Sequence, residues 1–125
     1  MEKKKLILLV DDSPEMAQVL SIYLRPDFEL KYFENPVLAV AWLQEGNLPD
    51  LIISDIKMPK MNGYEFLRYL KSSTLYKDIP VLMLSGIDSS SDRIQVLEEG
   101  AIDFILKPFN PMEIRARVKN HLRSR

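Results

Sequence analysis

Cysteine is absent from this chain of 125 residues, and histidine occurs once, as His121. Without cysteine the chain can form no disulfide, no thiolate metal site and no cysteine nucleophile. A single histidine cannot build a site with several histidine ligands. Seventeen Lys and Arg residues nearly balance eighteen Asp and Glu residues, for a formal net charge of -1. This balance argues against direct nucleic-acid binding through bulk positive charge.

Long hydrophobic runs are absent too. The first apolar segment, Leu6–Val10, is followed by two aspartates and is shorter than the roughly 7–15 apolar residues of a signal peptide. No segment approaches the roughly 18 apolar residues of a membrane span. Hydrophobic residues make up 46% of the chain and charged residues 28%, as in folded domains. We therefore expect a single globular domain over residues 1–125, cytoplasmic and without membrane attachment.

The chain does contain short apolar segments that alternate with helical patterns. Continuous apolar runs predict buried parallel strands, and one more polar segment predicts an edge strand; these lie at 6–10, 51–53, 81–84, 102–106 and, for the edge, 29–33. Apolar residues at helical spacing predict helices at 14–24, 37–43, 64–70, 93–99 and 111–122. Five strands alternating with five helices predict an α/β fold with an open, doubly wound parallel sheet.

Several helix starts carry a capping residue followed by proline, at Ser13-Pro14, Asn35-Pro36 and Asn110-Pro111. Glu113 stands three residues after Asn110, which predicts a pair resembling a capping box. Residues 88–92 form the most polar stretch of the chain, and we expect a mobile loop there.

Polar side chains stand where the predicted strands end. Ligands of an open parallel sheet bind outside the carboxyl ends of its strands, so these ends are the place to look for a site. They carry three carboxylates, one hydroxyl and one ammonium: Asp11, Asp12, Asp55, Ser85 and Lys107. We expect all five side chains to meet at one edge of the sheet.

Three carboxylates repel one another when they lie close together, unless some are protonated or a cation sits among them. A site of oxygen ligands without histidine or cysteine selects a hard ion, Mg²⁺ or Mn²⁺. Mg²⁺ prefers one or two carboxylates together with water and phosphate, which leaves a third carboxylate free as a nucleophile. Attack of a carboxylate on a phosphoryl group gives an aspartyl phosphate. Lys107 would neutralise the transferring oxygens, and Ser85 could hydrogen-bond one of them.

Together these segments resemble the receiver (phosphoacceptor) domain of two-component response regulators. The resemblance rests on Val-Asp-Asp-Ser at 10–13, the run Asp-Ile-Lys-Met-Pro-Lys-Met-Asn-Gly at 55–63, Ser-Gly at 85–86, and Gly-Ala-Ile-Asp-Phe-Ile-Leu-Lys-Pro-Phe at 100–109. The segments occur in the family's order and span nearly the whole chain. The resemblance implies a flavodoxin-like, CheY-like sheet with strand order 2-1-3-4-5.

The resemblance also implies a metal site and a phosphoacceptor. Asp55 would accept the phosphoryl group. Asp11 and Asp12 would bind Mg²⁺ beside Asp55, with the backbone carbonyl of Lys57 as a further ligand.

A switch is implied as well. Ser85 matches the switch hydroxyl, Phe104 the switch aromatic and Lys107 the phosphate-contacting lysine. The bond from Lys107 to Pro108 resembles one that the family holds in the cis form.

Partners follow from the same resemblance. The donor would be a histidine kinase or a phosphotransfer protein, and the readout a downstream effector or a fused output domain, with transcription the first candidate. The winged-helix transcription-factor branch pairs its receivers through helix 4, strand 5 and helix 5, and its charge set is matched by Arg93, Asp103, Glu113 and Arg117. A phosphorylation-promoted homodimer is therefore a hypothesis, although Ser124 stands where that branch has a basic residue.

Three other interpretations compete with this one. A flavodoxin-type cofactor binder would need a phosphate loop after the first strand, where Asp11 and Asp12 would repel phosphate. A phosphatase with an aspartyl nucleophile would need a second acid where Lys57 stands. A phosphorylation-independent interaction module remains the main alternative. On the favoured interpretation the protein assists its own phosphorylation but is not a turnover enzyme, and the chain is either a stand-alone receiver or the front of a longer regulator.

Overall fold

The computed structural model describes residues 3–58, 60–86 and 90–123, in which strands and helices alternate as predicted. The strands are β1 (Leu6–Val10), β2 (Glu29–Phe33), β3 (Leu51–Asp55), β4 (Val81–Ser85) and β5 (Asp103–Leu106). The helices are α1 (Pro14–Leu24), α2 (Pro36–Gln44), α3 (Gly63–Lys71), α4 (Ser90–Glu98) and α5 (Pro111–Arg123). No helix within these ranges is long and apolar enough to cross a bilayer.

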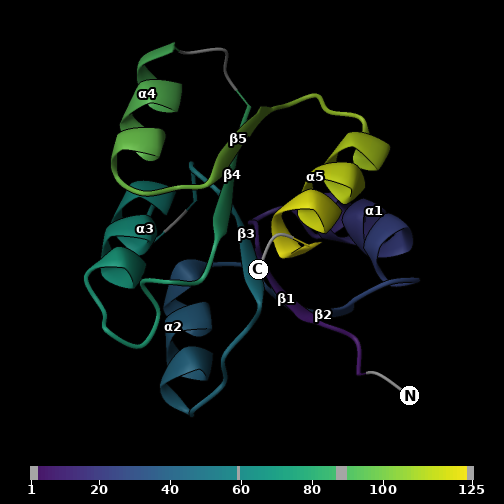
Figure 1. Cartoon of the computed structure of the whole chain (residues 1–125). Helices are drawn as coiled ribbons and strands as arrows, with labels where there is room; N and C mark the ends of the chain where they lie inside the picture. The colour runs from purple at the N-terminus through teal and green to yellow at the C-terminus, as the bar shows by residue number, and fades with distance from the viewer. Residues whose placement is uncertain (1–2, 59, 87–89, 124–125) are drawn as a thin grey trace.

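All five strands form one parallel sheet in the order β2-β1-β3-β4-β5, so the predicted fold class is confirmed. Figure 1 shows β2 and β5 at the two opposite edges, and the predicted edge position of β2 is therefore correct. The register pairs Val10 with Ser54 and Asp55 with Leu84. Because the strands run in parallel and end level with one another, their carboxyl ends form one edge of the molecule.

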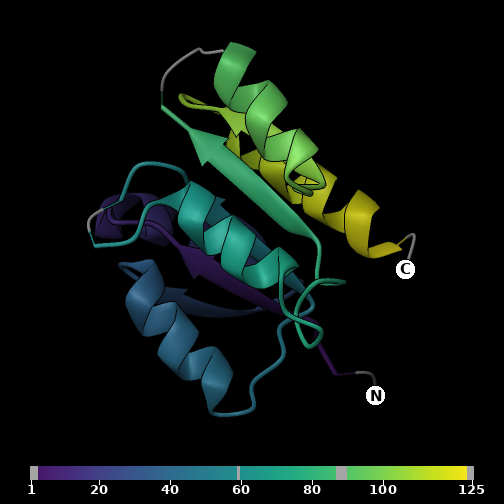
Figure 2. The same cartoon turned by 90° about the vertical axis from the view of Figure 1, so that its left-hand side faces the viewer.

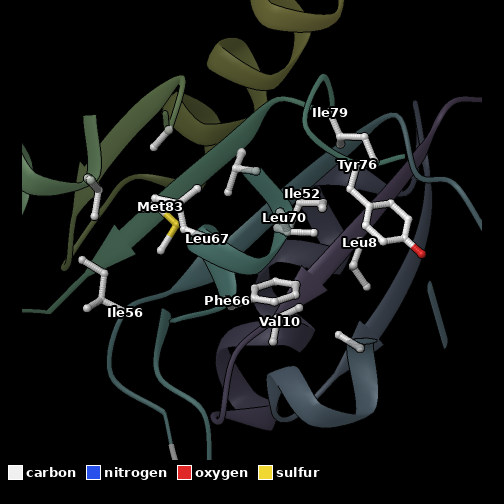
Figure 3. Packing of buried hydrophobic residues seen from close by; sticks show 14 of the residues in the cluster. Leu8, Val10, Ile52, Ile56, Phe66, Leu67, Leu70, Tyr76, Ile79 and Met83 are labelled. Atoms are coloured by element: carbon white, nitrogen blue, oxygen red, sulfur yellow. The ribbon is translucent and has the colours of Figure 1, made fainter. Parts of the chain in front are cut away.

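Helices cover both faces of the sheet, with α1 and α5 on one side and α2, α3 and α4 on the other (Figures 1 and 2). Alternate residues of each strand point to opposite faces. Leu8 and Val10 therefore join the core under α2 and α3, whereas Leu9 joins the core under α1 and α5. Figure 3 shows Phe66 of α3 packed beside Val10. Each fully buried side chain of this size contributes about 1.5–3 kcal/mol, which fixes the strands beneath the site.

The predicted caps of the first two helices are present. The Met16 N–H donates to Ser13 Oγ at 3.2 Å, and the Leu38 N–H donates to Asn35 Oδ1 at 3.0 Å. Proline at the first position of both helices has no N–H to leave unpaired.

Two local predictions are wrong. Glu113 and Asn110 do not form the predicted capping box. The Glu113 carboxylate accepts a hydrogen bond from Arg117 at 3.0 Å, and Asn110 Oδ1 accepts one from the Met112 N–H instead. A capping box that the sequence analysis did not predict is present at the start of α3, between Asn62 and Glu65.

The predicted loop at 88–92 is too long. Helix α4 begins at Ser90, three residues earlier than expected, so residues 90–92 form its first turn; residues 88 and 89 lie outside the described part of the chain. Val96 is the buried hydrophobic residue that the described part of α4 contributes to the core. The first turn of α4 has no apolar residue at helical spacing, so the sequence pattern does not indicate where this helix begins.

Candidate functional site

Three carboxylates and one ammonium meet at the carboxyl edge of the sheet, as predicted. Oxygen atoms of Asp11, Asp12 and Asp55 lie within 4.8 Å of one another. Asp11 and Asp55 are buried, and Asp12 is exposed. The Lys107 Nζ lies 3.2 Å from Asp11 Oδ2 and 3.0 Å from Asp55 Oδ2. One lysine thus bridges two buried acids, while the third acid opens the cluster to solvent.

Backbone hydrogen bonds fix both buried carboxylates. Asp55 is the last residue of β3, and its Oδ1 accepts the Ile56 N–H at 2.8 Å. The Asp11 Oδ1 accepts the Ser13 N–H at 2.9 Å, just before α1 begins. Each acid therefore keeps its second oxygen for Lys107, and neither depends on a mobile side chain for its orientation.

The electrostatics of the site follow from burial and pairing. Burial raises the pKa of the Asp11 carboxyl, and the Asp55 charge acts in the same direction, while the Ser13 N–H and the Lys107 ammonium partly offset both. Burial alone would lower the pKa of the Lys107 ammonium. Its hydrogen bonds and charge attraction to Asp55 and Asp11 outweigh burial and raise that pKa. Lys107 therefore stays charged at neutral pH.

The donor set fits a hard divalent cation. Three carboxylates face one ammonium, so one added positive ion would relieve the excess negative charge. The donors are all oxygen, which favours Mg²⁺ or Mn²⁺ over softer metals. The exposed Asp12 gives such an ion a route from solvent. Lys57 is exposed two residues after Asp55, and its backbone carbonyl stays a predicted ligand.

Ser85 and Phe104 stand beside this cluster. Ser85 is buried at the end of β4, and its carbonyl oxygen accepts the Lys107 N–H at 2.6 Å. Phe104 is buried in β5, opposite Met83 in the register, and the Arg93 guanidinium carbon lies 5.9 Å from its ring centroid. The peptide bond between Lys107 and Pro108 is cis, as the resemblance implied.

The sequence analysis assigned no role to two residues beside the acids, Gly63 and Tyr32. The Gly63 N–H donates to the Ile56 carbonyl at 2.6 Å. A Cβ atom at Gly63 would lie 2.6 Å from Ile56 Cα and closer still to the Asp55 carbonyl oxygen, so the start of α3 tolerates only glycine here. The Asn62-Gly63 pair was a readable sign of such a turn. The Tyr32 hydroxyl donates to the Asp11 carbonyl at 2.7 Å, a contact that depends on the pairing of β2 with β1.

Polar contacts also connect α3 to α4 near the site. The Tyr64 hydroxyl donates to Asp92 in the first turn of α4, and Arg68 pairs with Glu99 directly after the last residue of that helix. Burial and the Asp92 carboxylate raise the pKa of the Tyr64 hydroxyl to about 12. Tyr64 directly follows Gly63, so α4 is connected to the segment that packs on Asp55.

Of the four charges predicted at a dimer interface, Arg93 lies on α4 and the other three lie on β5 and α5. Arg117 donates to Asp103 at 2.7 Å and to Glu113 at 3.0 Å, within the same chain. His121 Nε2 lies 2.8 Å from Asp103 Oδ2. Arg93, Glu113 and Arg117 line a shallow depression of about 320 Å³ beside Phe104.

Comparison with known proteins agrees with this geometry. The family model described as "Response regulator receiver domain" matches residues 7–119. The chain is 38% identical to Response regulator Rre1 of Synechocystis sp. over 93% of its length and 51% of that protein. It is 37% identical to Histidine kinase P4 of Formosa agariphila over 99% of its length but 9% of the kinase. The chain thus spans about half of Rre1 and a small part of the kinase.

A solved structure agrees as well. The crystal structure of a putative response regulator from Chloroflexus aurantiacus superimposes with a TM-score of 0.91. Its sequence is 34% identical, and the match covers 97% of this chain and 99% of that one.

Proposed function

The chain belongs to the response regulator receiver domain family, and we propose that it accepts a phosphoryl group on Asp55 from a phosphohistidine of a histidine kinase or phosphotransfer protein. The observation that carries this proposal is the single ammonium of Lys107 between two buried carboxylates, 3.0 Å from Asp55 and 3.2 Å from Asp11. A lysine that only occupies a solvated turn would keep its ammonium in water, whereas the Lys107 ammonium contacts two carboxylates.

In the proposed step an oxygen of the Asp55 carboxylate gives an electron pair to the phosphorus of the donor, and an acyl phosphate forms. The bond from phosphorus to the histidine nitrogen of the donor breaks, and that nitrogen keeps the electron pair. The Ile56 N–H at 2.8 Å orients the carboxylate for this attack. Lys107, already at hydrogen-bond distance from Asp55, would neutralise charge on the transferred oxygens.

Asp11, Asp12 and Asp55 would hold Mg²⁺ or Mn²⁺, together with the Lys57 carbonyl. When bound, this ion would neutralise phosphoryl charge that Lys107 alone cannot balance. The exposure of Asp12 leaves the cluster open on the side from which a phosphodonor would approach.

Phosphorylation would then change the surface formed by α4, β5 and α5. We propose that Ser85 hydrogen-bonds the phosphoryl group and that Phe104 responds to this movement. The backbone N–H of Lys107 donates to the Ser85 carbonyl, which keeps the ends of β4 and β5 side by side at the site. Phe104 sits under Arg93 of α4, so a change at its ring would reach that helix. Signalling of this kind biases a two-state surface rather than making a new fold.

The test is the intact mass of the protein after incubation with acetyl phosphate. We expect one added phosphoryl group that requires Mg²⁺ and is absent in Asp55→Asn. The matched control is Asp50→Asn, which removes the aspartate just before the same strand and should not affect phosphorylation. Failure to form the adduct, together with failure to bind the phosphate mimic beryllofluoride, would support a phosphorylation-independent interaction module instead.

We further propose that the phosphorylated protein forms a homodimer through Arg93, Asp103, Glu113 and Arg117. The depression beside Phe104 and the exposed side chains of Ile94 and Leu97 on α4 support this proposal. Sedimentation of the beryllofluoride form should show a dimer in the wild type and a monomer in Arg117→Glu. A wild type that stays monomeric at tens of micromolar would contradict it.

On this proposal residues 1–125 form one signalling domain rather than a turnover enzyme. Transcription is our first candidate for the output, because the four interface charges resemble those of the winged-helix branch. The size of the protein made in its own organism tests this, since a fused DNA-binding domain would add to the 14.5 kDa of the chain. A native protein of the same mass would point to a separate effector.

A further inference from the structure

The outer edge of β2 is an open strand edge. Strand β2 has β1 as its neighbour on one side, and within the described residues no strand lies on the other side. The Glu29 N–H donates to the Lys5 carbonyl, and the Phe33 carbonyl accepts the Asp11 N–H, so both of these residues face β1. Backbone groups alternate along a strand, and those of Leu30 and Tyr32 therefore face outward.

A basic depression lies against this edge. It encloses about 500 Å³, and its lining combines three cations, from Lys4, Arg25 and Lys31, with one carboxylate, from Glu29. Phe28, Leu30 and Trp42 add apolar surface to the same lining. The edge thus offers backbone donors and acceptors, positive charge and apolar contacts in one place.

The cations have defined positions. The Lys4 ammonium donates to the Arg25 carbonyl at 3.1 Å. The Lys31 Nζ lies 5.3 Å from the centroid of the Phe33 ring, and that ring lies 5.9 Å from the ring of Trp42. Lys31 is exposed, so its charge is available to a partner, and its ammonium lies over the Phe33 ring, which favours that position.

We propose that the β2 edge binds an extended acidic segment of a partner protein, which adds to the sheet as a further strand. An added strand satisfies the outward backbone groups of Leu30 and Tyr32, and its acidic side chains would meet Lys4, Arg25 and Lys31. A second copy of this chain is a poor occupant. An antiparallel pair of β2 edges centred on Lys31 would place the two Lys31 ammonium groups opposite each other.

The charged side chains of this surface lie away from the acidic cluster, and the side-chain contact between the two is the Tyr32 hydroxyl bond to the Asp11 carbonyl described above. Lys4 and Glu29 lie at the amino end of β1 and β2, whereas Asp11 follows the carboxyl end of β1. One strand of five residues, about 16 Å, separates the two ends. Partner binding at the edge therefore does not require phosphorylation, and its failure would leave the proposed function untouched.

The test uses a fluorescein-labelled peptide of about ten residues, a length that spans one strand, in which Glu and Val alternate. We expect it to bind the full chain in fluorescence anisotropy, and the same peptide with Gln in place of Glu to bind at least about tenfold more weakly. Lys31→Glu should weaken binding by a similar factor. Lys77→Glu, which reverses an exposed lysine after α3, is the control and should bind like the wild type.

A second readout separates strand addition from simple charge attraction. On binding, the backbone amides of Leu30 and Tyr32 should become protected from hydrogen exchange, because only an added strand would accept their hydrogen bonds. Thermal unfolding of Lys31→Glu should match that of Lys77→Glu, which shows that the variant is folded. The proposal is overturned by equal binding of the Glu and Gln peptides, by unchanged amide exchange, or by tighter binding of single-stranded oligothymidine than of the acidic peptide.

Discussion

At the carboxyl end of the sheet two buried carboxylates share one ammonium, whereas at the amino end the lysines are exposed to solvent. Asp11, Asp55 and Lys107 form one group in which each member depends on the others. At the opposite end Lys3, Lys4 and Lys5 face solvent. The charges at one end of the sheet are therefore buried and paired, and those at the other end are solvated.

The difference has a physical consequence. A buried charge is stable only if hydrogen bonds or opposite charges replace its lost hydration. Removing one member of a buried group therefore leaves the others without compensation for their desolvation free energy. Exposed charge is solvated already and contributes little to stability, whatever its partner. On the proposed function the buried group at the carboxyl end carries the chemistry, and on the proposed strand addition the exposed cations at the amino end take part in binding. Four changes test this contrast, from the largest expected effect to the smallest.

Lys107→Met should have the largest effect. It removes the only ammonium that the described structure places on Asp11 and Asp55, and loss of one such charge-stabilising group typically slows a reaction about 10²–10³-fold. Phosphorylation by acetyl phosphate, followed by intact mass over time, measures the rate. The melting temperature of Lys107→Met should also lie below that of the wild type in metal-free buffer and recover in part when Mg²⁺ is added. Lys77→Met is the matched control, and an equal rate for both variants would contradict the role of Lys107.

Gly63→Ala should come next, as a loss of stability. The added Cβ would lie 2.6 Å from Ile56 Cα and closer still to the Asp55 carbonyl oxygen, and both neighbours are backbone. Overpacking of this kind costs about 1–3 kcal/mol. Urea unfolding measures the free energy. Gly86→Ala is the control, since among the described residues the nearest atom to its Cβ would be Lys107 Cδ at 4.0 Å. A similar loss in both variants would contradict a steric requirement for glycine at residue 63.

Tyr64→Phe should cost about 1 kcal/mol, because it removes one hydrogen bond to a carboxylate on α4. The folded pKa of Tyr64, about 12, lies above the usual 10.0. The stability due to the protonated hydroxyl is therefore fully present below pH 10 and is lost as pH rises toward about 12. Urea unfolding of both proteins over this range should show their difference shrinking as pH rises. A difference that stays constant would mean that the hydroxyl does not bind Asp92.

Asp50→Asn should have the smallest effect. Asp50 lies just before β3, and its Oδ2 accepts the Leu6 N–H at 2.7 Å. An amide oxygen can accept the same bond, so we expect a change in unfolding free energy of about 1 kcal/mol or less. Asp55→Asn, at the other end of the same strand, is the direct comparison in urea unfolding with and without Mg²⁺. Of these three proteins, the wild type and Asp50→Asn should gain more stability from Mg²⁺ than Asp55→Asn, and an equal gain in Asp55→Asn would contradict a metal site that includes Asp55.

The meeting of Asp11, Asp12, Asp55 and Lys107 was predictable because it needs only the strand ends and the rule that parallel strands end together. Short apolar runs gave those ends to within two residues. The strand order itself came from the resemblance, since periodicity does not tell which strands are neighbours.

Other features could not be predicted from the pattern alone. The bond from Tyr32 to Asp11 depends on the register of β2 against β1, which no local motif encodes. Glu113 had the spacing of a capping box, but Arg117, one helical turn later, competes for its carboxylate. The early start of α4 was not predicted because residues 90–92 are all polar and give no apolar periodicity.

Chemical trapping of the phosphorylated residue tests the central claim most directly. Borohydride reduces an acyl phosphate to an alcohol, so a phosphorylated aspartate becomes homoserine and can be located by peptide mass spectrometry. The tryptic peptide of residues 32–57 contains both Asp50 and Asp55, which makes the comparison internal. We predict homoserine at residue 55 and an intact aspartate at residue 50. Homoserine at residue 11, 12 or 50, with residue 55 unchanged, would contradict the assignment of Asp55 as the acceptor.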